Sequence, residues 1–312
     1  MESGNNFAVQ ATNDDASQCK LSAIRLGYWK DEFLQAMIDN GPRRAPEINR
    51  GYFARVRGVG LLIEQFLKRA GGDAQIINLG AGFDTLYWKL KSSNTPFKNF
   101  IELDFPAVTA RKLWAIKKKP LLANMIQDPV EELQPDRTNI HSKNYHLIGV
   151  DLRAVKDLEA KLRSINVDFS SPTLFISECV LVYIEFPLAQ NLLSWISSSF
   201  SSALFLHYDP INMTDKFGDV MVSNLRAHGC HLAGIDACTS LDTQKQRFLN
   251  TGWDGVNGED MCCIYASIPY SERSVIEKIE FLDEQELLTQ LFQHYCICSA
   301  WKGKLLADIS IT

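Results

Sequence analysis

Ile76-Ile77-Asn78-Leu79-Gly80-Ala81-Gly82 is the stretch of this sequence that decides the fold. It is a short apolar run that leads directly into a Gly-x-Gly turn, which is typical of the first strand of an open α/β sheet. Glycine has no Cβ, so the backbone turns tightly at these positions and a ligand can approach it closely. The turn lies at the carboxyl end of the strand, where open α/β sheets bind their ligands.

Apolar runs and helical segments alternate on both sides of this turn. The predicted strands are 74–79, 97–103, 145–150, the start of 173–184, and 203–208. Segments with helical spacing separate them, at 84–90, 108–116, 155–162 and 187–200. The strands are continuous apolar runs, as expected when helices cover both faces of a sheet. The sequence therefore predicts an α/β fold with an open, mostly parallel, doubly wound sheet.

The flanks of this core differ from it. Residues 1–17 are rich in Asn, Ser, Asp and Ala and are predicted to be a disordered tail. Helical spacing over 21–38 and 51–70 predicts a helical lid within 18–72, before a core at 73–209. Residues 210–312 form a late helical insertion with final strands: helices 213–229, 240–251 and 283–293, and strands 260–267 and 294–301. We interpret 18–312 as one domain.

Composition excludes several classes of protein. The 312 residues contain 32 Lys and Arg against 37 Asp and Glu, a net charge of -5 that argues against a general nucleic-acid surface. The eight cysteines form no C-x-x-C pair, so we expect buried free thiols and no metal site. The N-terminus shows no secretory signal, and the longest apolar run, 174–184, is too short to cross a membrane. We expect a cytoplasmic monomer.

Three acidic residues lie at or near the ends of neighbouring predicted strands. Asp104 follows the glycine turn by about one strand-helix unit, where a carboxylate accepts the hydroxyls of a ribose. Asp151 ends the third strand and can accept from an adenine amino group. Glu178 sits in the fourth apolar run, where a carboxylate needs a partner. That partner is either the ammonium end of a cofactor or a structural arginine.

The turn also indicates which cofactor it serves. The third glycine of a G-x-G-x-x-G fingerprint is missing, because Thr85 stands there after Asp84. An aspartate at a helix N-terminus repels a pyrophosphate but not the zwitterion of S-adenosylmethionine. S-Adenosylmethionine is therefore favoured over a dinucleotide. A nicotinamide-dependent dehydrogenase and an ordinary strand-to-helix turn remain the alternatives.

Several blocks of the chain resemble the leucine carboxyl methyltransferases. The blocks are 44–56, 78–85, 102–106 and 178–183, with shorter matches at 212–213, 217–218 and 280–284. The similarity runs from about Cys19 to Trp301. It implies a class I (Rossmann-like) methyltransferase that uses S-adenosylmethionine. A related branch acts on a transfer RNA and carries a long propeller, of which this sequence shows no repeat.

The resemblance also implies a substrate and a set of site residues. The family methylates the α-carboxylate of the C-terminal leucine of the protein phosphatase 2A catalytic subunit, so the expected partner is that tail together with the folded region around it. The implied cofactor contacts are Lys20 and Arg55 at the methionyl carboxylate, Gly80 beneath the cofactor, Asp104 at the ribose, Asp151 and Leu152 at the adenine, and Glu178 at the methionine end.

The expected chemistry needs no general base, since a C-terminal carboxyl with a pKa of about 3.3–3.7 is already ionised at neutral pH. Arg55 is the candidate that orients this carboxylate, because a guanidinium binds both oxygens; a surface salt bridge is the alternative. The hydroxyl of Tyr183 is the second candidate, with core packing as its alternative. A non-catalytic phosphatase-binding module and a small-molecule carboxyl methyltransferase are the rival functions.

Overall fold

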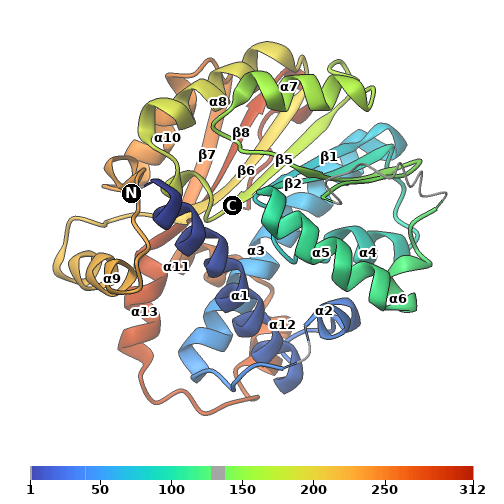
Figure 1. Ribbon diagram of the computed structural model, residues 1–312. Coiled ribbons are helices and arrows are strands. Elements are labelled where there is room, and N and C mark those ends of the chain that lie inside the picture. Colours follow the sequence, from blue (N-terminus) through green and yellow to red (C-terminus); the bar gives the residue numbers. More distant parts are fainter. Residues whose placement is uncertain (1, 39, 128–137, 312) are drawn as a thin grey trace.

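The computed structural model describes residues 2–38, 40–127 and 138–311, and these form an eight-stranded sheet (Figure 1). The strand order is β3-β4-β2-β1-β5-β6-β8-β7. The strands are β1 Gln75–Leu79, β2 Asn99–Asp104, β3 Ile140–His141, β4 Tyr145–Gly149, β5 Thr173–Glu178, β6 Ala203–Pro210, β7 Gly255–Asp260 and β8 Tyr295–Lys302. The five strands from β4 to β6 in this order pair in parallel. The pairs β3 with β4, β6 with β8 and β8 with β7 are antiparallel. The predicted open, mostly parallel α/β sheet is confirmed.

Helices cover both faces of this sheet. One face carries α7 Val155–Ser164, α8 Phe186–Ser199 and α10 Leu241–Leu249; the other carries α3 Pro46–Ala70, α4 Leu86–Ser92, α5 Pro106–Lys118, α11 Met261–Ser267 and α13 Gln285–Gln293 (Figure 1). Shorter helices are α2 Glu32–Met37, α6 Pro120–Ala123 and α12 Tyr270–Ile276, and α9 Lys216–Ala227 lies near the N-terminus. Ile76 packs into one apolar cluster and Ile77 into the other. Both faces of β1 are therefore dry, which explains its continuous apolar run.

The prediction of a disordered tail over 1–17 is wrong for the described residues. Helix α1 begins at Glu2 and runs to Leu26, and Met1 lies outside the described residues. Its polar side chains are tied to other elements: Asn13 to the backbone of Phe83, Asp14 to Arg111 and Asp15 to Arg44. Asn, Ser and Asp are poor helix formers, and here these tertiary contacts override that preference. The helix predicted over 21–38 is broken at Gly27, where φ is +91°, and resumes as α2.

The late strand predicted over 260–267 is also wrong, because residues 261–267 form helix α11. Asp260 caps this helix, its side chain accepting a hydrogen bond of 2.8 Å from the backbone N–H of Cys263. The strand lies just before it, as β7, and is a polar edge strand without an apolar pattern. The strand predicted over 294–301 is confirmed as β8.

All eight cysteines are free, and Cys19, Cys230, Cys238, Cys296 and Cys298 are buried, as expected for small apolar side chains. Cys263 is exposed. No group of three or more His, Cys, Asp and Glu side chains within the described ranges could hold a metal ion. The helices that the structure describes include none with the length and apolar character needed to cross a membrane.

Candidate functional site

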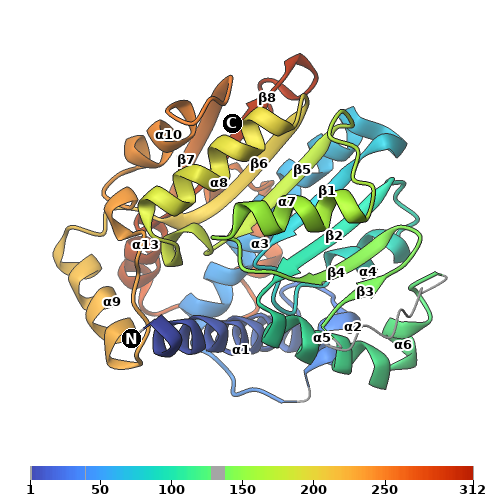
Figure 2. The ribbon, with the colours of Figure 1, turned by 45° about the horizontal axis from the view of Figure 1, so that its top comes forward.

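A cleft of about 880 Å³ lies at the carboxyl ends of the parallel strands. Helix α1 passes along these strand ends and forms one wall of the cleft (Figure 2). Every site residue predicted from the sequence lines it: Lys20, Arg55, Gly80, Asp104, Asp151, Leu152, Glu178 and Tyr183. The sheet topology explains this convergence, because parallel strands bring their carboxyl ends to one edge.

The glycine turn, residues 80–82, forms the floor of the cleft. Gly80 has φ +61°, and a Cβ there would lie 2.6 Å from Cγ2 of Val180. Gly82 has φ +48°, and a Cβ there would collide with Oδ1 of Asn13. Both the backbone conformation and the close neighbours exclude a larger side chain at these positions. Packing against Val180 and Asn13 within the protein therefore already requires glycine at these two positions.

Replacing Gly80 by alanine should destabilise the protein by about 1–3 kcal/mol, because the new methyl group both strains the backbone and pushes Val180 aside. Thermal unfolding measures the loss. Gly72→Ala is the matched control, since its Cβ meets no atom within 4 Å, and its stability should stay within about 0.5 kcal/mol of wild type. Equal stability of Gly80→Ala and wild type would contradict the packing described here.

Asp104 ends β2 and is held rigidly against the glycine turn. Its Oδ2 accepts a hydrogen bond of 2.7 Å from the backbone N–H of Gly82, and its Oδ1 accepts one of 2.7 Å from Phe105. Burial raises the pKa of Asp104 above its ordinary value, while the two N–H groups and Lys112 oppose that rise. The carboxylate is thus oriented before any ligand arrives, and its remaining lone pairs can accept hydroxyl groups.

Arg55, which is buried on α3, forms an ion pair with the partly buried Glu178 at the end of β5. Nε of Arg55 donates to Oε2 of Glu178 at 2.5 Å. The guanidinium also lies over the rings of Tyr208 and Tyr52, at 4.5 Å and 5.6 Å from their centroids. Burial lowers the pKa of Arg55, but Glu178 together with Cys179, Tyr208 and Tyr52 raises it, and the net pKa lies well above its usual range. Arg55 is therefore a permanent cation in an aromatic cage.

Glu178 therefore has a structural arginine, Arg55, as a partner, which was one of the two alternatives named from the sequence. Burial raises the pKa of Glu178, whereas Arg55 and Lys20 lower it and leave the net pKa below its usual range. Glu178 is ionised at neutral pH. A second group that carries a positive charge could share this carboxylate with Arg55, because a carboxylate accepts at two oxygens.

An acidic side chain occupies the N-terminus of α4. Oδ1 of Asp84 accepts a hydrogen bond of 2.7 Å from the N–H of Leu86, and Nζ of Lys20 lies 3.5 Å from Oδ2. Burial raises the pKa of Asp84, whereas the positive charges of Lys20, Lys89 and Lys112 lower it. The net pKa is about 2, below the ordinary value of an aspartate. A permanent negative charge therefore sits where a dinucleotide fold places its pyrophosphate.

Asp151 and Leu152 follow β4 at the edge of the cleft. Both carboxylate oxygens of Asp151 accept hydrogen bonds from Arg153, between 2.6 and 3.0 Å. Burial raises the pKa of Asp151, and Arg153 lowers it to a net value below the ordinary one. The pairing with Arg153 was not foreseen from the sequence, and an amino group from a ligand would have to share this carboxylate.

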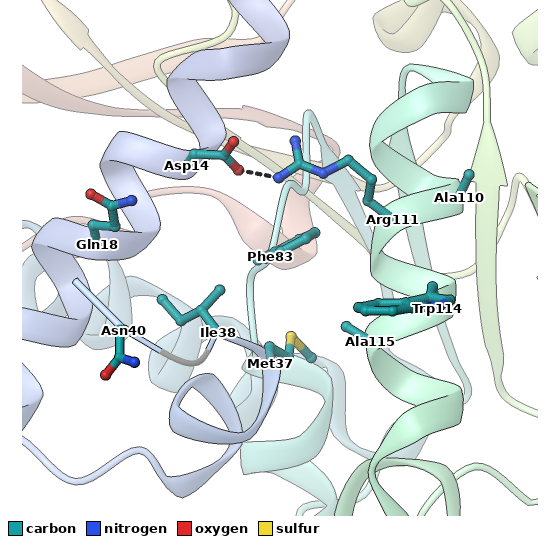
Figure 3. A pocket seen from close by; sticks show the side chains of 10 residues that line it. All are labelled: Asp14, Gln18, Met37, Ile38, Asn40, Phe83, Ala110, Arg111, Trp114 and Ala115. Atoms are coloured by element: carbon teal, nitrogen blue, oxygen red, sulfur yellow. Dashed lines mark hydrogen bonds and ion pairs between the residues drawn. The ribbon is translucent and has the colours of Figure 1, made fainter.

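Helix α1 is tied to the core directly beside the glycine turn. Oδ1 of Asn13 accepts a hydrogen bond of 2.9 Å from the N–H of Phe83. Asp14 pairs with Arg111 of α5 at 2.5 Å, and that guanidinium lies 5.5 Å from the centroid of the Phe83 ring. Figure 3 shows this bridge at the rim of a second pocket, of about 550 Å³, which is lined by α1, by Met37, Ile38 and Asn40, and by α5. These contacts hold α1 over the cleft.

The far end of the cleft is lined by residues that the sequence analysis missed. They come from the late part of the chain: Leu225 of α9, His228 directly after it, Cys230, Met261 of α11, Leu291 and Phe292 of α13, and Tyr295 of β8. The ring of Tyr295 stacks on Tyr208, with centroids 5.1 Å apart, and so joins this apolar end to the cage around Arg55. No motif in the sequence marks these residues, because apart from His228 they share only their largely apolar character.

Tyr183 lines the cleft from the turn that follows β5. Burial raises the pKa of its hydroxyl well above the usual range. The hydroxyl therefore stays protonated at neutral pH and can donate a hydrogen bond.

Comparisons with known proteins agree with this geometry. A family model described as leucine carboxyl methyltransferase matches residues 8–197. The chain is 47% identical over 298 residues to leucine carboxyl methyltransferase 1 of Bos taurus, covering 95% of this chain and 90% of that protein. The homologue of that enzyme in Arabidopsis thaliana is 37% identical, with the same coverage.

Two more distant matches help to define the branch and the fold. The tRNA wybutosine-synthesizing protein 4 of Homo sapiens is 35% identical over 308 residues, which are 96% of this chain but 45% of that protein. A solved structure of a putative methyltransferase from Thermobifida fusca shares 12% identity with a TM-score of 0.51, covering 86% of this chain and 93% of that one, and so supports the fold alone. With a family model over more than half of its length and relatives at this identity, the chain belongs to the leucine carboxyl methyltransferase family.

Proposed function

We propose that this protein transfers a methyl group from S-adenosylmethionine to the α-carboxylate of the C-terminal leucine of the protein phosphatase 2A catalytic subunit. The product is a leucine methyl ester. The observation that carries the proposal is the placement of Arg55, a caged cation, between the glycine turn and an apolar end of the cleft. The proposal assigns the cofactor to the glycine turn, the binding of a carboxylate to Arg55 and a pocket for an aliphatic side chain to the apolar end.

The polar end of the cleft fits an adenosyl cofactor without phosphates. Asp104 has free lone pairs for the ribose hydroxyls, and Gly80 offers a backbone that a ligand can approach. Lys20 and Arg55 would hold the cofactor's carboxylate, and Glu178 its ammonium group. Asp84 at the start of α4 opposes a pyrophosphate, which argues against the nicotinamide alternative.

The apolar end fits the acceptor. Met261, Leu291 and Phe292 offer an aliphatic and aromatic surface for a leucine side chain. The acceptor's carboxylate would then lie near Arg55 and the protonated hydroxyl of Tyr183. One charged and one neutral donor would orient the carboxylate without fully neutralising it, which preserves its nucleophilicity.

The residues of the cleft need only position the acceptor and exclude water. When bound, S-adenosylmethionine supplies an electrophilic methyl group, and its sulfur keeps the electron pair of the broken bond. The acceptor carboxylate is already ionised at neutral pH, so no residue has to remove a proton. Arg55 and Tyr183 align its oxygen, and α1 shields the site from solvent.

We further propose that residues 18–72 act as a lid over a core at 73–209, with 210–312 completing the acceptor end. Support comes from Lys20 of α1, which pairs with Asp84 beside the glycine turn at 3.5 Å, and from the position of α9, α11 and α13 around the apolar end. We infer that the protein is a cytoplasmic monomer. It binds both the tail and the folded body of the phosphatase subunit.

Labelled methyl transfer to the phosphatase 2A catalytic subunit tests the bond that forms. The label should be incorporated and then released by mild alkali, because a methyl ester hydrolyses there while methylated nitrogen does not. A catalytic subunit with an amidated C-terminus is the control and should take up no label. Alkali-stable label, or equal label on the amidated control, would contradict the proposal.

A further inference from the structure

The ring of Tyr208, on β6, lines the cleft beside Arg55. Cζ of the Arg55 guanidinium lies 4.5 Å from the centroid of this ring, and the ring of Tyr52 lies farther from it, at 5.6 Å. All three side chains line the cleft, and that of Tyr208 is buried. Tyr208 therefore makes the closer of the two cation–π contacts of Arg55.

Tyr208 is held in place by its own neighbours. Its ring lies at 6° to that of Tyr295 on β8, with the two centroids 5.1 Å apart. Its backbone carbonyl accepts a hydrogen bond of 2.7 Å from the N–H of Cys179, the residue directly after Glu178. Both the ring and the backbone of Tyr208 are thus fixed by the protein itself, without the help of a ligand.

The guanidinium of Arg55 keeps donors for a ligand. Glu178 engages the edge formed by Nε and Nη2: Nε donates to its Oε2 at 2.5 Å, and Nη2 donates to its backbone carbonyl at 3.4 Å. A guanidinium has five N–H groups, and these bonds use only two. Among the residues that the structure describes, none accepts a hydrogen bond from Nη1. The edge formed by Nη1 and Nη2 can therefore bind a carboxylate.

The pairing with Glu178 leaves the plane of the guanidinium incompletely fixed. The short bond from Nε places that atom, but the guanidinium can still turn about the bond, and the 3.4 Å bond from Nη2 restrains this rotation weakly. The face of an aromatic ring attracts a cation that lies over it. Tyr208 therefore favours the one orientation in which the guanidinium stays over its ring.

We propose that Tyr208 is a positioning residue for the methyl transfer proposed above: its ring holds the Arg55 guanidinium so that the edge formed by Nη1 and Nη2 meets the acceptor carboxylate. The inference rests on that proposed function. The ring of Tyr208 carries this role and its hydroxyl does not. Because a fork of two N–H groups must lie in the plane of the carboxylate that it binds, loss of the ring should lower kcat/KM for the acceptor about tenfold.

Fluorination of the ring tests this role without changing the packing greatly. Tyr208→Phe keeps the ring face and should leave kcat/KM within about twofold of wild type. Phenylalanines with one, two and three ring fluorines at the same position draw electrons away from that face, and kcat/KM should fall stepwise, by about tenfold in total. A ring that only fills space would give no such trend, and a flat series would overturn the proposal. So would a tenfold loss from Tyr208→Phe itself, since that loss would assign the role to the hydroxyl.

The same fluorinated residues at position 205 are the matched control. Phe205 is also buried on β6, but it packs into the apolar cluster on the other face of the sheet and does not line the cleft. Its fluorination should leave kcat/KM near wild type. An equal stepwise loss at position 205 would show that the trend does not arise from the contact with Arg55, and would overturn the proposal.

A double-mutant cycle tests whether Tyr208 acts through Arg55. Tyr208→Leu should lower kcat/KM about tenfold in the wild-type background and less than about twofold in an Arg55→Ala background, because the contact is already lost there. If Tyr208→Leu fails to fold, the trifluorinated ring takes its place in the cycle. Equal losses in both backgrounds would overturn the positioning role. Wild-type protein that transfers no methyl group would instead contradict the proposed function, and the inference with it.

Discussion

Replacing Arg55 by alanine is expected to lower kcat/KM for methyl transfer about a thousandfold, which corresponds to about 4 kcal/mol. The variant loses the cation that would orient the acceptor carboxylate, and it leaves Glu178 buried without its 2.5 Å partner. A smaller loss, of about ten- to a hundredfold, is expected for Arg55→Lys, which keeps the charge but not the planar fork. Steady-state kinetics with labelled S-adenosylmethionine measures both.

Arg57→Ala is the matched control for this experiment. Arg57 lies on the same helix and also makes ion pairs, at 2.8 Å with Glu64 and 2.7 Å with Glu272, but it does not line the cleft. Its loss should cost about 1 kcal/mol of stability or less and leave kcat/KM near wild type. If Arg55→Ala turned over at the wild-type rate while circular dichroism showed an intact fold, Arg55 would have no role in the site.

Asp104→Asn is expected to weaken S-adenosylmethionine binding about a hundredfold, as measured by calorimetry, since hydrogen bonds from hydroxyls to a carboxylate contribute about 1.5–3 kcal/mol each. The asparagine keeps one oxygen for the N–H of Gly82 or Phe105, so the glycine turn should survive. Asp104→Asn should therefore disturb the folded structure less than Asp104→Ala would.

Asp168→Asn provides the comparison for Asp104. Asp168 also accepts a backbone N–H, that of Ser170, and pairs with Lys98, but it lies on an exposed turn outside the cleft. Its binding of S-adenosylmethionine should match that of wild type. A Kd for Asp104→Asn within twofold of wild type would show that this carboxylate does not hold the cofactor.

The polar half of the site was predictable because the chemistry is local. Gly80, Asp104 and Glu178 each follow or end an apolar strand, and a parallel sheet necessarily brings such strand ends together. The outline of the sheet was predictable for the same reason, since each strand is a continuous apolar run between helical segments. The sequence pattern does not predict which ion pairs form within the cleft, such as that of Asp151 with Arg153.

The apolar half was not predictable from local patterns. Met261, Leu291 and Phe292 lie on two late helices, and one of these occupies a segment expected to be a strand. Their position beside Arg55 depends on how α11 and α13 pack on the sheet. The first part of helix α1, residues 2–17, escaped prediction in a similar way, because its helix-poor sequence is stabilised by contacts such as Asp14 with Arg111.

Methyl transfer to phosphatase 2A core enzyme, with and without the terminal leucine of its catalytic subunit, tests the central claim most directly. Labelled S-adenosylmethionine is the donor, and the label on the catalytic subunit is counted. The placement of Arg55 beside an apolar pocket predicts label on the intact subunit and none on the shortened one. Equal label on both would contradict the assignment of the terminal leucine carboxylate as the acceptor.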